Sequence, residues 1–402
     1  MAPAELIVVG GGISGLALAW KAARAGRRVL VLEREQRLGG CIHSETTARG
    51  YWFELGAHTT YNSYGSMLDI VAERGIAGEM RPRGEARAKF GLLRDGEYRW
   101  LTPYKVLLQL SWLEAGFQAP LGILRSKSGR TMREYFSAIV GARNYQRILA
   151  PFLAAVPSQS ADGFPAAGPG SLFKTRPRRT EFMRSFGFEG GLQRVIDAAA
   201  ATPGITIERG AAVRAALATS SGCTISLDDG RTLSAPRAAL ATPVEVTSRL
   251  VRETNPALAA ALSNIATVSI DSLGVVLPRE KCWMPACAFL VPVDDTFFSC
   301  VTRDPFPDDR FRAFAFHFRS GLTREARLAR AYQILRVRES DVVHIAEKQV
   351  TLPAPARDHQ QRVAEIDRAL RGSPLALTGN YFDGLAIEDC VLRSNAEWNR
   401  IA

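Results

Sequence analysis

A glycine-rich turn near the start of the chain carries the clearest chemical signal in the sequence. The short apolar run at residues 6–9 is typical of a buried parallel strand. The turn at residues 10–15, with the sequence GGGISG, follows it and leads into a helical run. A second apolar run, residues 29–32, ends at Glu33. A glycine turn between a strand and a helix, with an acid at the end of the next strand, predicts a dinucleotide site.

Each residue type in this turn has a physical reason. Gly10 permits the tight turn, and Gly12 lets the backbone approach a pyrophosphate. Gly15 allows the helix to pack closely on the strand. The unpaired amides at the start of the helix, around Ile13 and Ser14, hold the phosphates with the help of the positive end of the helix dipole.

Glu33 and the segments after it narrow the choice of dinucleotide. A carboxylate at Glu33 accepts hydrogen bonds from a ribose 2′-hydroxyl and repels a 2′-phosphate. A second glycine pair, Gly39-Gly40, follows the acid, and residues 54–58, with the sequence ELGAH, come after a short excursion. A nicotinamide dehydrogenase is the alternative, but such an enzyme would not require Gly39, Gly40 or Gly56.

The run from residue 10 to residue 40, together with residues 53–58, resembles the start of the FAD-dependent amine-oxidase superfamily. The resemblance implies that FAD is the cofactor and that the second glycine pair and the G-x-H segment wrap its pyrophosphate and ribityl chain. We expect FAD to be held non-covalently, because no Cys or His lies in a recognised flavinylation motif. The same matching adds these residues to the predicted cofactor site: Arg34, Cys41, Gly56, Ala57, His58, Val213, Gly379, Leu385, Ala386 and Ile387.

Within that superfamily the chain is most similar to the protoporphyrinogen and coproporphyrinogen oxidases. Four passages carry this similarity: residues 131–141, 148–153, 188–192 and 379–390. The last of them is the segment that borders the flavin ring in the family. It leads into a final helix whose amino end is expected to face the pyrimidine edge of the ring and to stabilise negative charge there.

The chain also departs from that branch in places that lie close to the flavin in relatives. Cys41 replaces a basic residue directly after the second glycine pair, where a small packed thiol is the simplest interpretation. Lys348 and Pro355 align with positions that usually hold Trp and Tyr, and Asp358 aligns with a glycine. These differences predict a rebuilt substrate pocket.

The pattern of strands and helices predicts an α/β fold in which two domains interleave. A Rossmann-type FAD-binding domain takes residues 1–80, 190–262 and 345–402. An α+β substrate domain takes residues 81–189, expected to be mainly helical, and residues 263–344, expected to form a sheet with one helix.

The catalytic residues are harder to identify, because the flavin carries the chemistry in this family. No acid–base pair with the spacing of a nucleophilic site is present. Relatives that oxidise amines place a lysine on a strand before a Trp, and here the aligned residue is Arg279, or Lys281 after a shift of two. A solvated surface arginine is the simpler interpretation of Arg279. Lys89 matches an arginine near a substrate carboxylate, and its alternative is an exposed strand residue.

We therefore expect an FAD-dependent oxidoreductase that removes a hydride from a small-molecule substrate that is bulky and acidic or apolar. A protoporphyrinogen-oxidase-like reaction, with oxygen or a quinone as acceptor, is the first hypothesis. The alternatives are a flavin amine oxidase, a desaturase acting on a polycyclic or isoprenoid substrate, and a non-oxidising flavoprotein.

Composition limits the partners and the location. The net charge of +11 favours acidic partners, but the basic residues are spread without a nucleic-acid motif, so we expect no nucleic-acid partner. The six cysteines lack metal-type spacing, which predicts no metal site. The N-terminus lacks a signal-peptide pattern, so a cytoplasmic protein is expected. The apolar face of residues 104–113 is read as a pocket wall or as a peripheral membrane contact.

Overall fold

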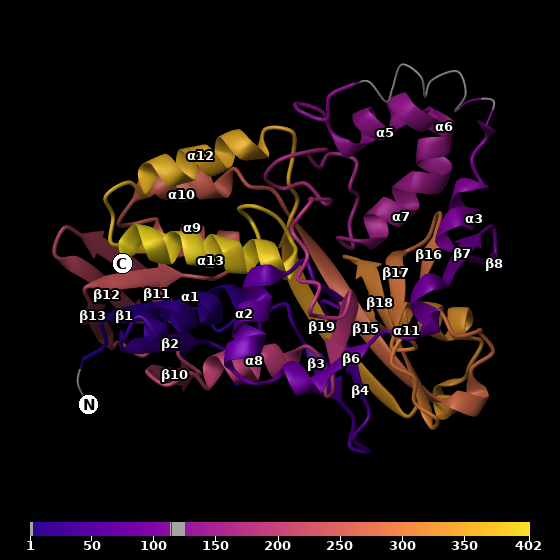
Figure 1. Cartoon of the computed structure of the whole chain (residues 1–402), viewed down its shortest axis with the longest axis horizontal. Helices are drawn as coiled ribbons and strands as arrows, with labels where there is room; N and C mark the ends of the chain where they lie inside the picture. Colours follow the sequence, from indigo (N-terminus) through magenta and orange to yellow (C-terminus); the bar gives the residue numbers. More distant parts are fainter. Residues whose placement is uncertain (1–2, 113, 115–124) are drawn as a thin grey trace.

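The computed structural model describes residues 3–112, 114 and 125–402, and it has two lobes (Figure 1). One lobe is built on a five-stranded parallel sheet in the order β10-β2-β1-β14-β20. Strand β1 is the point from which the chain winds in both directions, and ligands bind at the carboxyl end of such a strand. The glycine turn lies at this end. The strands are β1 (Leu6–Val9), β2 (Val29–Glu33), β10 (Ile205–Arg209), β14 (Arg237–Leu240) and β20 (Leu375–Leu377).

Both faces of this sheet are buried, which explains its continuous apolar strands. Val8 and Val31 pack among four helices on one face, while Ile7 and Val9 pack on the other face, because alternate side chains point in opposite directions. The first face carries α1 (Ile13–Arg24), α2 (Gly65–Glu73), α8 (Gln193–Ala200) and α13 (Ile387–Ile401). The second carries the sheet of β11 (Val213–Thr219), β12 (Gly222–Leu227) and β13 (Thr232–Ala235), with α9 (Val244–Val251), α10 (Pro256–Ser263) and α12 (His359–Ala369).

The other lobe is built on a seven-stranded sheet in the order β19-β15-β18-β17-β16-β7-β8. Leu273, Val275 and Leu277 point to one face, where they pack against α11 (Arg324–Leu335). Strands β7 and β8 form a hairpin across Asp95-Gly96. The strands are β7 (Phe90–Arg94), β8 (Glu97–Leu101), β15 (Thr267–Pro278), β16 (Phe289–Pro292), β17 (Phe297–Thr302), β18 (Phe311–Arg319) and β19 (His344–Pro353).

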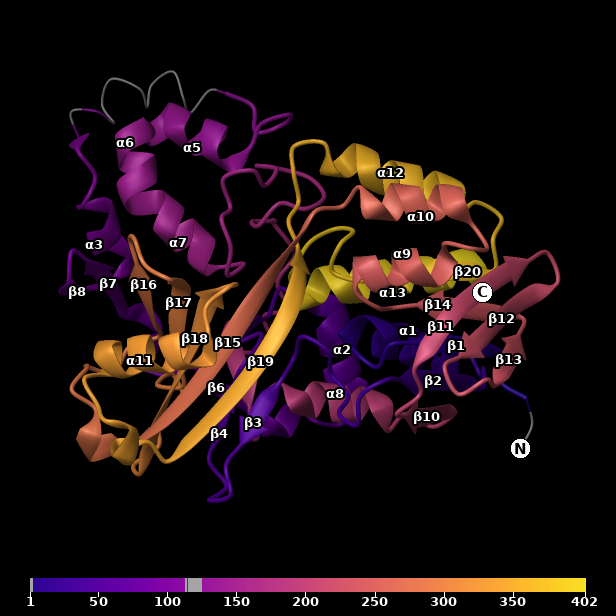
Figure 2. The ribbon, with the colours of Figure 1, turned by 180° about the vertical axis from the view of Figure 1, so that it is seen from behind.

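Strand β19 corrects the predicted domain boundary at residue 345. It pairs with β15 along its whole length, from Val276↔His344 to Thr267↔Pro353, so it belongs to the substrate lobe. Figure 2 shows β15 and β19 running side by side between the two lobes. The final segment of the FAD lobe therefore starts after Pro353. The alternating polar pattern of β19 is that of an edge strand, and the boundary predicted from the sequence placed all but its first residue in the FAD-binding domain.

Residues 81–189 are less helical than predicted. They supply β7 and β8 to the large sheet and also β9 (Ser185–Phe188), which pairs with β5 (Thr60–Tyr61) and β6 (Met80–Pro82). Pro120, a residue type that breaks helices, lies outside the described residues. The helices in this region are α3 (Pro103–Leu107), α5 (Met132–Val140), α6 (Ala142–Asn144) and α7 (Ala150–Ala155), with a π-helical turn (Tyr145–Leu149) between the last two.

Candidate active site

The glycine turn after β1 has two kinds of glycine. Gly10 has a φ of +109°, and a side chain at Gly15 would lie 2.0 Å from the carbonyl oxygen of Gly10. Both glycines are therefore required by the protein's own packing. A side chain at Gly12 meets no atom nearer than 3.8 Å, and its nearest neighbours are the backbone of Gly39 and Gly40. The space beside Gly12 is a backbone-lined cradle of the kind that a pyrophosphate fills.

Glu33 is held at the edge of this cradle. Its Oε2 accepts a hydrogen bond of 2.7 Å from the Gly11 amide, and its Oε1 accepts one of 2.9 Å from the Glu35 amide. The carboxylate is thus fixed at the carboxyl end of β2, where a ribose hydroxyl is expected. Arg34 points elsewhere, because its guanidinium pairs with Glu35 on the surface.

Arg37, which lies outside the predicted site, positions the second glycine pair. Gly39 and Gly40 have φ of +115° and +55°, and the Gly39 amide donates to the Gly11 carbonyl at 2.9 Å. The Arg37 guanidinium donates to the carbonyl oxygens of Leu38, Ile42 and Gly40 at 2.7–3.0 Å. Arg37 therefore locks a turn that would otherwise be strained and flexible.

Lys348 connects this turn to the seven-stranded sheet. Its Nζ donates to the carbonyl oxygens of Gly40 at 2.6 Å and Cys41 at 3.3 Å. Burial lowers the pKa of the Lys348 amine to about 8. Gly56 packs against the same segment, since a side chain there would lie 2.0 Å from the Cys41 carbonyl oxygen. The thiol-bearing residue Cys41 is exposed and is not in a disulfide.

Lys348 is the first member of a polar row that crosses the sheet on one face. Ser272 of β15 lies opposite Lys348 of β19 and opposite His317 of β18, and His317 lies opposite Ser299 of β17. Directly opposed residues on neighbouring strands share a face. The hydroxyl of Ser299 is buried and has no hydrogen-bond partner among the described residues. A row of polar side chains in such an apolar sheet marks a functional face.

His58, from the predicted cofactor segment, lies against this row. The Nε2 atoms of His58 and His317 are 3.0 Å apart, and Nδ1 of His317 lies 2.9 Å from the Ser272 hydroxyl. Burial lowers the pKa of His317 to about 4 and lowers that of His58 as well, with the charge of Arg83 adding to the effect on His58. Both imidazoles are therefore neutral at pH 7, and the bond between them contains one proton.

The hydrogen bonds that link His58, His317 and Ser272 can run in either direction. When Nε2–H of His317 donates to His58, the Ser272 hydroxyl donates to Nδ1 of His317. When Nε2–H of His58 donates to His317, Nδ1–H of His317 donates to the Ser272 hydroxyl. His58 is only part-buried, and its Nδ1 makes no hydrogen bond to a described residue. His58 is therefore the end of this hydrogen-bonded series that a bound molecule can approach.

The C-terminal segment closes the predicted cofactor site. Gly379 adopts a φ of +158°, Ala386 is the N-cap of α13, and Ile387 is its first residue. The Ser394 hydroxyl, in the middle of α13, donates to the Ser14 carbonyl at 2.8 Å, so the first turn of α1 is held against α13. Leu385 packs against the helical part of the substrate lobe.

The acids in the first turn of α13 are satisfied by other groups. Glu388 accepts hydrogen bonds from the amides of Ser66 and Met67, and Asp389 pairs with Lys174 and Arg176. Their charges are thus engaged away from the amide end of the helix, which stays available to a developing negative charge.

Three other predicted residues lie away from the polar row. Arg279 is in a 3-10 turn (Arg279–Lys281) seven residues beyond Ser272, about 23 Å at 3.3 Å per residue. Its guanidinium donates to the Asp308 carbonyl, and Lys281 pairs with Asp341. Lys89 is exposed and forms no ion pair with the residues that the structure describes.

Val213 is the first residue of β11, and the nearby amide of Ala211 donates to the Glu33 carbonyl at 2.9 Å. This bond brings the start of β11 to the end of β2, beside the predicted ribose position. Across residues 3–112, 114 and 125–402, no cluster of His, Cys, Asp and Glu of the kind that holds a metal ion is found.

Sequence reasoning missed His317, Ser272 and Ser299, although a signal for them exists. Each is a polar residue inside a strand whose neighbours are almost entirely apolar and buried. Such residues need partners, and their register places them side by side.

Solved structures with the same fold cover the whole chain. One is a candidate protoporphyrinogen oxidase from Exiguobacterium sp. 255-15, with a TM-score of 0.81, 20% identity, and coverage of 100% of this chain and 99% of that one. Another is cyclohexylamine oxidase from Brevibacterium oxydans, with a TM-score of 0.71, 16% identity, and coverage of 99% and 98%.

Curated relatives match over shorter stretches. Coproporphyrinogen III oxidase from Propionibacterium freudenreichii is 33% identical over 95 residues, 24% of this chain and 18% of the relative. The 15-cis-phytoene desaturase of Capsicum annuum is 34% identical over 74 residues, 18% of this chain and 13% of the relative. These alignments therefore cover less than a fifth of either relative.

The model of the family described as flavin containing amine oxidoreductase matches residues 13–336, which is most of the chain. The cradle beside Gly12 and the fixed Glu33 fit its dinucleotide cofactor, FAD. This chain is an FAD-dependent oxidoreductase and belongs to the flavin containing amine oxidoreductase family.

Proposed function

We propose that the enzyme oxidises a bulky substrate that is acidic or apolar, in a reaction like that of protoporphyrinogen oxidase. The observation that carries the proposal is the polar row beside the cofactor segment, with Lys348 at one end and the pair of His58 and His317 over its centre. This arrangement supplies a cation and a proton acceptor on one face of the sheet.

FAD, when held beside Gly12 and Glu33, would supply the acceptor for a hydride from a substrate C–H bond. The proton that the substrate loses from a neighbouring N–H or O–H group goes to Nδ1 of His58, and the bond to His317 passes charge towards Ser272. Lys348 is protonated at pH 7 and lies at the glycine turn that wraps the cofactor, so it stabilises negative charge that develops there.

The apolar part of the same face suits a bulky ring system. Phe90 and Phe289 stack with centroids 4.6 Å apart, and Phe152 of α7 lies edge-on to Phe90. With the net charge of +11, this aromatic wall suits a large, flat molecule that bears carboxylates. Lys89, the residue directly before β7, is the proposed contact for one carboxylate. We propose oxygen or a quinone as the electron acceptor.

An uncharged isoprenoid or polycyclic substrate is the second candidate. The similarity to a phytoene desaturase and the aromatic wall favour it. A cationic amine is favoured less, since the nearest charged member of the row is Lys348, and like charges repel.

The test is anaerobic mixing of the FAD-loaded enzyme with one substrate of each class. Bleaching of the flavin absorption by a porphyrinogen supports the first proposal, and bleaching only by a neutral polyene supports the second. Bleaching by a primary amine, with none by an acidic polycycle, contradicts both.

We also propose that the enzyme works in the cytoplasm and rests on a membrane. Tyr104, Leu108 and Trp112 are each about 60% exposed, so they form an outward patch rather than a pocket wall. The predicted face also includes Leu113, which lies outside the described residues. No helix of the described chain is both long and apolar enough to cross a bilayer. Flotation with anionic vesicles, lost in Trp112→Ser, would support this contact, and unchanged flotation would contradict it.

A further inference from the structure

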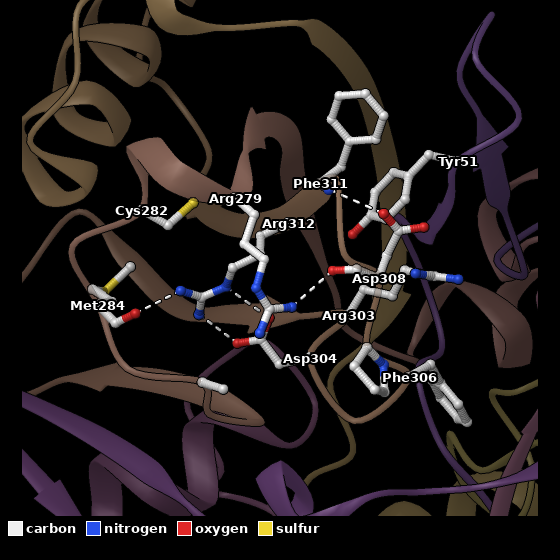
Figure 3. A pocket seen from close by; sticks show the side chains of 12 residues that line it. Tyr51, Arg279, Cys282, Met284, Arg303, Asp304, Phe306, Asp308, Phe311 and Arg312 are labelled. Carbon is white, nitrogen blue, oxygen red and sulfur yellow. Dashed lines mark hydrogen bonds and ion pairs between the residues drawn. The ribbon is translucent and has the colours of Figure 1, made fainter.

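A cavity of about 250 Å³ lies at the opposite end of β18 from His317 (Figure 3). Arg312, which lines it, is five residues from His317, about 17 Å along the strand. Arg303, which follows β17, lies at its wall together with Tyr51, Phe306 and Asp308. A smaller cavity under Trp52 shares Arg303 and Phe306 with it. The function proposed above uses none of these residues.

Arg303 has donors that no acceptor satisfies. Its guanidinium carbon lies 4.5 Å from the ring centroid of Tyr51 and 4.3 Å from that of Trp52. Its Nε and Nη1 are buried and have no hydrogen-bond partner in the described part of the chain, and the same is true of Nε1 of Trp52. Buried donors of this kind are rare in folded proteins, and three of them on two touching residues indicate a missing acceptor.

The acids of the pocket are already engaged. Asp304 forms a bidentate ion pair with Arg312 and also accepts a hydrogen bond from the Cys287 amide. Asp308 accepts hydrogen bonds from the amides of Arg310 and Phe311. Figure 3 shows the Arg312 guanidinium turned towards Asp304 and Met284, while Arg303 extends towards Tyr51 and Asp308. Among the arginines that line the pocket, Arg312 pairs with Asp304 and Arg279 donates to the Asp308 carbonyl, while Arg303 keeps buried donors without a hydrogen-bond partner among the described residues.

We propose that this pocket binds a small organic anion through Arg303, with a carboxylate as its charged group and an apolar body. A carboxylate offers only acceptors, which is what the guanidinium and the Trp52 indole lack. Phe306, Phe311 and Met284 provide apolar contact for the body of the ligand. The cavity is smaller than the roughly 300–1,000 Å³ of sites for drug-sized molecules, so the ligand is small.

The larger cavity is lined by no residue of the polar row, and His58 lines only the smaller one. Binding in the larger cavity needs no turnover, so its test does not depend on the proposed reaction. The probe is 4-fluorobenzoate, followed by ¹⁹F NMR with the FAD-loaded enzyme. We expect saturable binding that leaves the visible flavin spectrum unchanged. Benzamide, which has the same shape without the charge, should bind at least tenfold more weakly.

Arg303→Gln should weaken binding of 4-fluorobenzoate at least tenfold. Arg319→Gln is the matched control, because Arg319 lies on β18 and covers the Phe298 ring at 4.2 Å but donates to the Asp295 carbonyl. Arg319→Gln removes the same charge and should leave binding of 4-fluorobenzoate unchanged.

Trp52→Phe keeps an aromatic ring and removes one hydrogen-bond donor, so it should weaken binding of 4-fluorobenzoate several-fold. This variant replaces Arg303→Gln as the test if Arg303→Gln fails to retain FAD.

Three results would overturn the proposal. One is equal binding in the wild type and in both site variants. Another is a shift of the flavin bands on binding, which would place the probe at the cofactor. The third is displacement of 4-fluorobenzoate by inorganic phosphate at a phosphate concentration below that of the probe, which would show that the site binds phosphate in preference to a carboxylate.

Discussion

The Nε2 atoms of His58 and His317 lie 3.0 Å apart, although the two residues are 259 positions apart in the chain. One belongs to the segment that follows the glycine motifs, and the other to the middle of the substrate sheet. Their contact therefore joins the cofactor lobe to the substrate lobe. In the proposed reaction, this pair of neutral imidazoles would couple substrate deprotonation to the buried hydroxyl of Ser272.

The His317 pair makes stability depend on pH in a defined direction. The pKa of His317 falls from 6.5 to about 4 on folding, so between these pH values the imidazole is protonated in the unfolded chain and neutral in the folded chain. The contribution of the neutral His317 to the free energy of unfolding, on the order of 3 kcal/mol, is complete above pH 6.5 and is lost as the pH falls towards 4. His317→Asn should remove this loss.

Urea unfolding at several pH values measures the effect. Glu54 has the opposite slope in an overlapping range, because burial raises its pKa to about 7 and its protonated form is favoured in the folded state. The difference between the wild-type and variant curves isolates His317, since both contain Glu54. Parallel curves between pH 4 and 6.5 would contradict the neutral imidazole pair.

The glycine turn allows folding and cofactor binding to be separated. Gly12→Val should leave the apoprotein folded, because no protein atom lies within 3.8 Å of the added Cβ, but it should abolish FAD binding by filling the cradle. Gly15→Ala should instead destabilise the fold, since its Cβ would lie 2.0 Å from the Gly10 carbonyl oxygen. Thermal unfolding and FAD content after gel filtration give the two readouts. A yellow Gly12→Val protein would show that the pyrophosphate lies elsewhere.

Glu33 tests the ribose contact. Glu33→Ala should weaken FAD affinity by roughly 1–3 kcal/mol, the usual effect of losing a charge-assisted hydrogen bond. Turnover at saturating FAD should change little. Part of the loss will come from the turn itself, because Glu33 also holds the Gly11 amide. Glu33→Gln keeps an acceptor there and should lose less, as measured by titration of the apoprotein; equal losses would argue against a charged contact.

The attachment of FAD gives a direct test of the non-covalent expectation. Acid precipitation should release all the flavin into solution as FAD. Cys41 is the exposed thiol beside the second glycine pair, so it is the residue to check first if colour stays in the pellet. Colour that remained in the wild type and disappeared in Cys41→Ser would identify a covalent link.

The sequence predicted the cofactor lobe well because its signals are local. The strand at residues 6–9, the glycine turn and Glu33 lie within one unit of chain, and their spacing alone implies their geometry. The polar row could not be predicted in the same way. Lys348, Ser272 and His317 come from three strands, and their register is set by packing across the sheet. Arg279 illustrates the difference: its match to a motif near the flavin was the less simple interpretation, and the structure has it exposed, beyond the end of β15.

Lys348 provides the sharpest test of the row. Its pKa of about 8 means that the cation is present at pH 7 and is lost as the pH rises through 8. The rate of anaerobic flavin reduction should therefore fall above pH 8. Lys348→Met should lower the rate at pH 7 about 10- to 100-fold, the kinetic equivalent of roughly 1.4–2.7 kcal/mol, and should make the reduction potential of the bound FAD more negative.

Lys348→Arg is the matched control, because arginine stays protonated throughout this range. It should retain part of the rate and lose the decrease above pH 8. Stopped-flow reduction between pH 6 and 10, with spectroelectrochemical titration of the flavin, measures both properties. An alkaline decrease that persists unchanged in Lys348→Arg would assign the titration to another group, and an unchanged potential in Lys348→Met would show that the amine only braces the Gly40 turn.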